Sequence, residues 1–407
     1  MEKLKKIMLP IMSAVVVVST LISSQASAAT TTFKDVQANH WAKSAIESAV
    51  SKGYFKGYGN GLFKPNASVT RAEFASLISR VAKDMTLPED VQTDSFKDLN
   101  GHWSKAEVDR AVTLGFINTK DYPNGFKPST PITREEMAKW LSSGLVASSA
   151  EYKTAFAETK ETLLPVKESF KPGIAQDKIP YLAVAMGTNL MNGFPDGSFG
   201  MDKTTTRAES SAILLRLENV LKKEAVAFDD LNELRMMGTK KTNLELVSSL
   251  TTGKTSIADI SGKRKTFRNG SGSLVFHRLI GINTSEPKKK DSIYTSLFMT
   301  EFGMNKYKNS GLLPVFTEIT IYPKKNGFAI GDLVSGVIDM NGRGMTITNK
   351  LDEKYGYVTV PNIETAKFFA KYKNGVKVWL VDYLEIKDFY GQFNMDDGSY
   401  AVISNNN

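Results

Sequence analysis

Residues 63–73 read FKPNASVTRAE, residues 126–136 read FKPSTPITREE and residues 199–209 read FGMDKTTTRAE. In each stretch a phenylalanine lies seven residues before Thr-Arg-x-Glu. The second copy starts 63 residues after the first, and the third starts 73 residues after the second. Self-similarity at such intervals is typical of repeat architectures, in which neighbouring units share one core. The sequence therefore predicts three related units with linkers of variable length.

The Thr-x-x-Glu part of each copy is a capping box, in which the threonine and glutamate side chains satisfy free backbone N–H groups where a helix begins. The helix-capping pairs are Thr70 with Glu73, Thr133 with Glu136, and Thr206 with Glu209. Apolar residues follow at helical spacing: Phe74, Leu77, Ile78 and Val81; Met137, Trp140 and Leu141; Ile213, Leu214 and Leu217. Each copy is therefore expected to open a helix.

An earlier helix is expected in each unit, after His40-Trp41 and His102-Trp103 in the first two, with a Gly/Pro-rich loop before the second helix. The third unit departs from this pattern. Asp177 stands where the tryptophans stand, and Phe170-Lys-Pro-Gly replaces the Phe-Lys-Asp found near the start of the other two. We therefore expect the third unit to complete the fold but to bind ligand less well.

Phe-x-Asp, His-Trp, a Gly-rich loop, Phe-x-Pro and Thr-Arg-Ala-Glu together resemble the S-layer homology domain, across about residues 30–222. The resemblance implies a pseudo-threefold arrangement of helix–loop–helix repeats. It also implies that the module holds an exported protein on a Gram-positive-type cell wall or in its surface layer. The implied partner is a secondary cell-wall polysaccharide that carries pyruvate ketals.

An arginine follows each cap, beside the free N–H groups and partial positive charge of a helix start, which is a favourable setting for a carboxylate or phosphate. By resemblance, Arg71, Arg134 and Arg207 would each bind a pyruvate carboxylate. Three weak sites acting on one polymer would gain avidity. Trp41 and Trp103 have two interpretations, as core residues or as platforms on which a sugar stacks.

The first residues have the order of a secretory signal, with Lys3, Lys5 and Lys6, then an apolar run from Ile7 to Ile22, then Ala26-Ser-Ala28. An uncleaved anchor is the alternative. The chain has 407 residues, no cysteine and a formal charge of +9. A disulfide framework is thus excluded, and a basic exported chain favours anionic wall polymers over nucleic acid as partners.

The second half alternates β-branched and aromatic residues with polar ones, which predicts a mostly β domain. Strands are expected over 315–322, 328–338, 345–348, 357–360 and 376–383, and a helix over 363–372. The whole chain is thus expected to be multidomain, all-α and then mostly β. The predicted boundaries are 1–28 signal peptide, 29–85, 92–148 and 169–225 repeats, 149–168 linker, 226–247 connector and 248–407 β domain.

We found no catalytic or metal-binding signature in the second half. Thr252-Gly-Lys-Thr255 lacks the first glycine of a phosphate-binding loop, and His277 has no partner histidines or cysteines for zinc. Two hypotheses remain. The chain is either a non-enzymatic surface protein without a cofactor, or a cell-wall-modifying enzyme delivered by the same anchor, whose carboxylate pair the sequence does not reveal.

Overall fold

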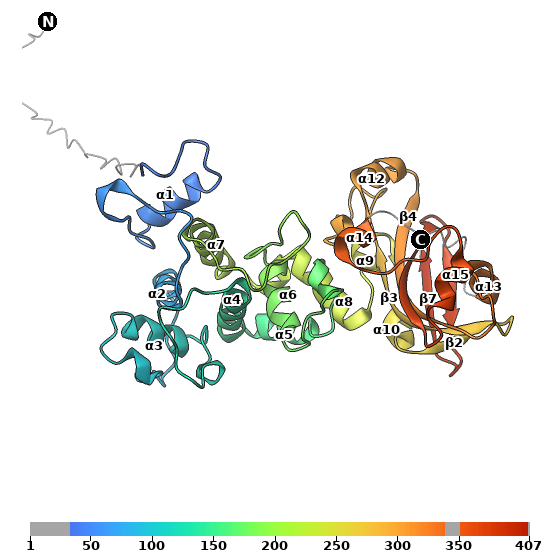
Figure 1. Ribbon diagram of the computed structural model, residues 1–407, viewed down its shortest axis with the longest axis horizontal. Helices are drawn as coiled ribbons and strands as arrows, with labels where there is room; N and C mark the ends of the chain where they lie inside the picture. Colours follow the sequence, from blue (N-terminus) through green and yellow to red (C-terminus); the bar gives the residue numbers. More distant parts are fainter. Residues whose placement is uncertain (1–32, 338–350, 406–407) are drawn as a thin grey trace, which may run out of the picture.

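The computed structural model describes residues 33–337 and 351–405, and within them the chain forms a helical lobe followed by a β-rich lobe (Figure 1). The predicted signal peptide and the strand expected over 345–348 lie outside the described residues. No helix within the described ranges is both long and apolar enough to cross a membrane.

Each repeat contributes two helices, and the second begins at the arginine of the repeated motif. The pairs are α1 (Lys43–Ser51) and α2 (Arg71–Val81), α3 (Lys105–Thr113) and α4 (Arg134–Ser148), and α6 (Ile179–Gly187) and α7 (Arg207–Val220). A further helix, α5 (Ala150–Glu158), separates the second and third pairs. Short 3-10 turns lie at Gly59–Gly61, Lys97–Leu99, Thr119–Asp121, Lys167–Ser169 and Ala225–Ala227.

Short backbone bridges join the three motifs in a closed cycle. Thr70 pairs with Pro131, Thr133 with Thr204, and Thr206 with Ser68. The first two amides of each motif helix also donate to the next repeat, as when the Arg207 amide donates to Ala67 O at 2.9 Å. Each helix start is therefore satisfied by backbone from a neighbouring repeat.

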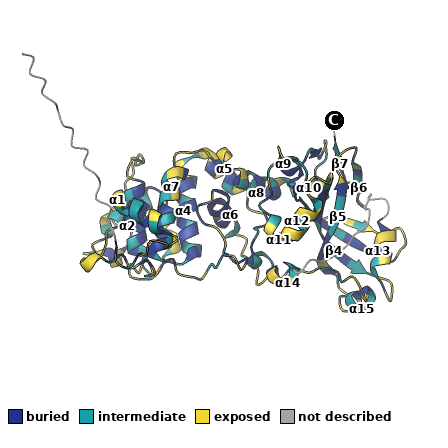
Figure 2. Ribbon diagram, turned by 90° about the horizontal axis from the view of Figure 1, so that it is seen from above, coloured by how far each residue is buried: buried dark blue, intermediate teal, exposed yellow. Residues whose placement is uncertain are grey.

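The core of the helical lobe is built from the phenylalanines that define the repeat. Phe63, Phe126 and Phe199 are fully buried. Phe126 stacks on the buried Trp140 of α4 at a centroid distance of 5.8 Å. In Figure 2 the motif helices are mostly buried or half-buried, because each packs among the other helices of the lobe.

The second lobe contains two antiparallel sheets. One has the strand order β2-β3-β4-β5 and the other has the order β1-β7-β6. The strands are β1 Leu250–Thr251, β2 Arg264–Thr266, β3 Gly272–Gly281, β4 Leu312–Pro323, β5 Val376–Glu385, β6 Tyr390–Asn394 and β7 Tyr400–Asn405. Short helices surround them: α9 Leu244–Val247, α10 Ile257–Ile260, α11 Thr295–Phe298, α12 Glu301–Tyr307, α13 Ile330–Gly336, α14 Leu351–Tyr355 and α15 Thr365–Ala370.

Some expectations for this lobe are confirmed and others are wrong. The strands over 315–322 and 376–383 lie within β4 and β5, and the helix over 363–372 contains α15. The strand over 328–338 is wrong, because residues 330–336 form α13, where Asp332 Oδ2 accepts from the Ala329 amide at 3.0 Å. Residues 357–360 form a single bridge, from Thr359 to Trp379, and no regular strand.

The helix α8 (Asp229–Lys240) joins the two lobes through a fully buried carboxylate. Glu233 accepts from Ser292 Oγ at 2.6 Å and from the Ile293 amide at 3.0 Å, and it lies 3.0 Å from Lys290 Nζ. Figure 1 shows α8 between α5 and α6 on one side and the sheets on the other. Within the range 226–247, α8 is therefore a packed helix, with the Glu233 carboxylate buried at the joint between the lobes.

Candidate functional site: the seams between repeats

The helix starts have the capping geometry that the repeated motif predicts, with one difference. Thr70 and Thr206 each accept from the glutamate amide three residues on, and each glutamate reaches back to the threonine amide at 2.8 Å. Thr133 accepts from the Glu136 amide at 3.2 Å, but the Glu136 side chain turns away. It lies 2.8 Å from Arg71 Nε and accepts from Tyr122 Oη at 2.5 Å instead.

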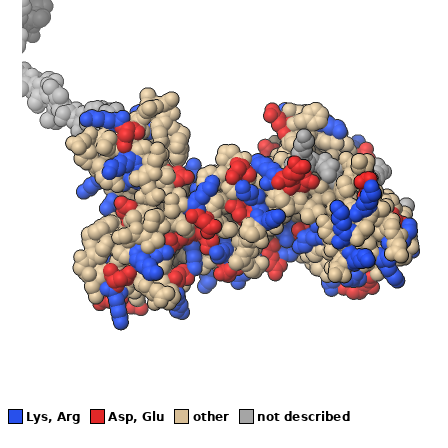
Figure 3. Space-filling view, in the orientation of Figure 1, with Lys and Arg blue, Asp and Glu red and all other residues tan. Residues whose placement is uncertain are grey.

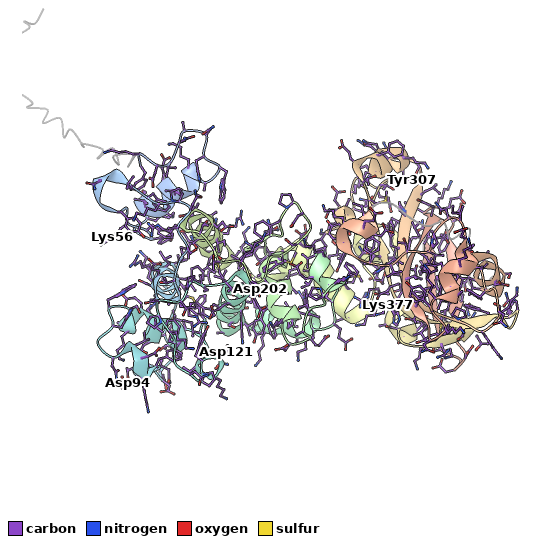
Figure 4. The ribbon with its side chains drawn as sticks, viewed as in Figure 1. Lys56, Asp94, Asp121, Asp202, Tyr307 and Lys377 are labelled. Carbon is purple, nitrogen blue, oxygen red and sulfur yellow. The ribbon has the colours of Figure 1, made fainter. Side chains whose placement is uncertain are left out.

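The three motif arginines point into the loop of a neighbouring repeat. Arg134 donates through Nε to Phe199 O at 2.9 Å and through Nη2 to Asn192 O at 2.7 Å. Arg207 makes the same two kinds of bond, to Phe63 O at 2.9 Å and to Lys56 O at 2.8 Å. In Figure 4, Lys56 labels this loop of the first repeat, above α2.

Arg71 occupies the corresponding place between the first and second repeats but is bound differently. Its Nη1 donates to Phe126 O at 3.0 Å, and its Nε pairs with Glu136. Glu136 has left its own cap to make this pair, and at the other two seams a second carbonyl is bound instead. A longer ion pair, 3.9 Å from Arg134 Nη1 to Glu209, lies at the second seam.

Aromatic rings of the loops cover the guanidinium groups. The guanidinium carbon of Arg71 lies 5.0 Å from the Tyr122 ring centre, that of Arg134 lies 4.5 Å from Phe194, and that of Arg207 lies 4.8 Å from Tyr58. Such distances are typical of cation–π contacts. These rings were not among the predicted site residues, although their position in each Gly-rich loop was a signal for them.

Burial of these arginines differs from the expectation of open anion receptors. Arg134 and Arg207 are 5% and 7% exposed, whereas the Arg71 side chain is 18% exposed. Burial lowers the pKa of Arg134, although Glu209 and Glu168 act in the opposite sense. A guanidinium has five N–H donors, so each group keeps donors beyond its two seam bonds. The arginines therefore have a structural role at the seams, in addition to any role toward a ligand.

In each repeat a carboxylate near the start of the repeat accepts hydrogen bonds from backbone amides at the motif phenylalanine. Asp35 accepts from the amides of Phe63 and Lys64 at 2.8 and 2.7 Å. Asp98 accepts from Phe126 and Lys127 in the same way, at 3.0 and 2.7 Å. Burial acts to raise the pKa of each aspartate, but the backbone N–H groups outweigh it and hold the pKa below its ordinary value.

The third repeat keeps this carboxylate, contrary to the alignment inferred from the sequence. Glu168 accepts from the amides of Phe199 and Gly200 at 3.0 and 2.9 Å. Val166-Lys-Glu168 therefore replaces Phe-Lys-Asp, and Phe170-Lys-Pro-Gly does not. Glu168 was not predicted because it is a glutamate in place of an aspartate. Its separation from the motif phenylalanine also differs by three residues from that in the other two repeats.

The two tryptophans are exposed, so their interpretation as core residues is wrong. Trp41 is 67% exposed and Trp103 is 60% exposed. Each lies beside its neighbouring histidine ring, at centroid distances of 5.9 and 5.5 Å. The histidines make local hydrogen bonds, as when His40 Nδ1 accepts from the Ala42 amide at 3.1 Å. Two indole rings are thus available to a ligand, whereas Asp177 is exposed at the corresponding place in the third repeat.

An open pocket of about 800 Å³ lies between the repeats at the opposite ends of α2 and α7 from the motif arginines. Its basic lining residues are Lys52, Arg80, Lys83, Arg110 and Lys222, and its acidic ones are Asp84, Glu107 and Glu218. Elsewhere on the face seen in Figure 3, basic and acidic side chains are interspersed on both lobes. The pocket is therefore a second place in the helical lobe where an anionic polymer would meet excess positive charge.

Comparison with known proteins places the repeats in a family. The family model of the S-layer homology domain matches residues 32–75 and 95–138, which are the first two repeats. A cellulosome-anchoring protein of Acetivibrio thermocellus is 36% identical over 118 residues, or 28% of this chain and 26% of that protein. The S-layer protein sap of Bacillus anthracis is 27% identical over 62% of this chain and 27% of its own length.

Enzymes are also among the relatives. An amylopullulanase of Thermoanaerobacterium thermosulfurigenes is 30% identical over 46% of this chain, which corresponds to 9% of the enzyme. The chain thus spans about a quarter or less of the length of these relatives. The two matched repeats and the surface proteins among the relatives lead to one conclusion: this is a secreted, cell-wall-associated protein that carries S-layer homology domains.

Proposed function

We propose that the helical lobe, residues 29–225, anchors this protein without a covalent bond by binding a pyruvylated secondary cell-wall polysaccharide. The observation that carries the proposal is the triple recurrence of one setting, a guanidinium fixed between repeats with N–H donors to spare. The closed cycle of bridges supports a pseudo-threefold arrangement of three repeats. A polymer that repeats its acidic unit would engage several seams at once, and avidity would multiply weak contacts.

In this mechanism the seams supply fixed positive charge and the tryptophans supply apolar contact. The carbonyl bonds hold each guanidinium in one orientation, so little side-chain entropy is lost when a carboxylate arrives. Arg71 would contribute most, because its side chain is the least buried of the three. Trp41 and Trp103 would stack on sugar rings. The third repeat would bind least, because it has no indole at that place.

The basic pocket would take a further acidic unit of the same polymer. Lys83 and Lys222 are exposed at its rim. Exposed lysines attract an anionic chain over roughly a Debye length, about 8 Å at physiological ionic strength. Binding should therefore weaken as salt is raised.

The test is co-sedimentation of the mature chain with native cell wall, with wall stripped of the secondary polymer, and with wall whose polymer lacks pyruvate. We expect strong pelleting with the first preparation and much weaker pelleting with the other two. Equal pelleting with all three would refute the ligand assignment. The double variant Trp41→Ala/Trp103→Ala should pellet less, whereas Trp41→Phe/Trp103→Phe, which keeps a ring at each place, should retain most of the binding.

We further propose that the protein is a non-enzymatic surface or surface-layer component. The support for this proposal is the presence of a cellulosome-anchoring protein and an S-layer protein among the relatives. A cell-wall-modifying enzyme is the competing proposal, since relatives of the anchor include enzymes. Release of soluble fragments from purified wall by the mature chain would establish that alternative.

A further inference from the structure

A pocket of about 230 Å³ lies in the β-rich lobe, between α12 and the faces of β4 and β5. Its wall includes the aromatic rings of Tyr307, Phe316, Trp379 and Tyr383. Tyr307 and Tyr383 stack on each other at a centroid distance of 4.4 Å. Figure 4 labels Tyr307, the last residue of α12, at the top of the β-rich lobe, above Lys377. The pocket is thus distinct from the seams of the helical lobe.

The rim of this pocket carries the most exposed large apolar side chain of the described residues. Phe302 on α12 is 80% exposed and lines the same pocket. Lys306, one helical turn further along, is exposed at the rim as well. An exposed aromatic side chain at the rim of an aromatic-lined pocket is typical of a ligand-binding surface.

The composition of the wall indicates the kind of ligand. Sugar rings present apolar C–H faces and hydroxyl edges, so they suit aromatic rings placed beside polar groups. The polar groups here are the hydroxyls of Thr300 and Thr359 and the ammonium of Lys306. The hollow is smaller than the roughly 300–1,000 Å³ of sites for drug-sized ligands. Its volume therefore fits a single ring better than a whole oligosaccharide.

We propose that this pocket binds one pyranose ring of a peptidoglycan strand, with Phe302 and Tyr307 stacking on the sugar. A cell-wall-associated chain is surrounded by such rings at high local concentration, so weak affinity is sufficient. The site would give the β-rich lobe its own contact with the wall. It does not depend on the secondary polymer, and its success or failure is separate from that of the anchor.

The experiment uses the mature chain and two probes, the N-acetylglucosamine trimer and a free stem peptide. Saturation-transfer NMR should show contact with the trimer, and titration should show about three- to tenfold weaker binding for Phe302→Ala. The matched control is Ile363→Ala, which removes a side chain that is 77% exposed in the same lobe but outside the pocket. The control should bind as the unaltered chain does.

A second measurement separates this site from the anchor. On wall stripped of the secondary polymer, the residual binding of the mature chain should fall with Phe302→Ala and remain with Ile363→Ala. Equal trimer binding by the unaltered chain and Phe302→Ala would overturn the proposal. So would absence of trimer binding, or binding of the stem peptide alone.

Discussion

Replacing Arg134 with alanine tests whether the motif arginines hold the repeats together. The side chain is 5% exposed and donates to two carbonyls of the third repeat. Leaving a buried acceptor unpaired costs about 1–3 kcal/mol, and losing the aromatic contact costs about 0.5–2 kcal/mol more. With two acceptors left unpaired, we therefore expect Arg134→Ala to lower the free energy of unfolding by about 2.5–8 kcal/mol.

Arg71→Ala is the matched comparison. It removes one carbonyl bond, one partly exposed ion pair and the aromatic contact with Tyr122, so we expect a smaller loss, about 1.5–5 kcal/mol. Both variants are measured in the mature chain by urea unfolding followed by far-ultraviolet circular dichroism. Arg134→Lys should recover little of the lost stability, because one ammonium on a flexible side chain does not reproduce the two guanidinium hydrogen bonds to two carbonyls.

Two outcomes would refute this reasoning. The first is a cost for Arg134→Ala below about 1 kcal/mol, which is near the average for any substitution. The second is a larger cost at Arg71 than at Arg134. If Arg134→Ala lost wall binding while its unfolding curve stayed unchanged, the arginine would act on the ligand alone.

Three further perturbations follow from the geometry. Glu233→Ala removes a fully buried carboxylate that accepts from Ser292 and the Ile293 amide, while Lys290 keeps Asp230 as a partner, so it should lower the free energy of unfolding by at least about 1–3 kcal/mol, and an unchanged urea curve would contradict the role of the joint. Gly238→Ala places a Cβ 1.9 Å from Glu158 O, so it should lower the free energy of unfolding by at least about 1–3 kcal/mol. The control Gly331→Ala adds a Cβ in open space, so it should leave the free energy of unfolding unchanged or raise it. The lowered pKa of Asp98 contributes stability that is present above the unfolded pKa of about 3.9 and is lost as the pH falls below it. In Asp98→Asn the melting temperature should therefore fall less steeply over that acid range. An equally steep fall would exclude this aspartate as a cause.

The helical lobe could be predicted well because its signals are local. A capping box and a 3.6-residue apolar period need only neighbouring residues, and α2 and α7 begin at the arginine that follows the predicted cap. What the sequence did not reveal is the destination of side chains that cross between repeats. Glu136 leaves its cap for Arg71, 65 residues away, and no local pattern predicts such a contact.

The β-rich lobe was predicted less well for a related reason. Strand β3 was missed because its hydrophobic run is interrupted by His277 and Arg278, whose side chains find partners across the sheet. His277 Nε2 lies 2.8 Å from Thr320 Oγ1, and Arg278 Nε donates to Glu318 at 2.9 Å. At α13 a strand was predicted and a helix is found. A short apolar segment is compatible with either, and here the cap decides.

For the candidate site, the sequence located the arginines but not their surroundings. Their place after each cap follows from the motif, whereas their burial depends on the loop of another repeat. The exposed state of Trp41 and Trp103 was equally beyond a local pattern, because an indole at a helix start packs inward or outward according to what lies across from it.

The ring of bridges has a consequence for how such a module is inherited. Since Thr206 pairs back to Ser68 and Arg207 donates to the first repeat, the last unit completes the first. A gene that lost a single unit would encode an open chain in which one helix start and one partner loop are left unsatisfied. Duplication or loss would thus be tolerated only for the set of three, which makes the triplet, not the single repeat, the smallest piece that evolution can move.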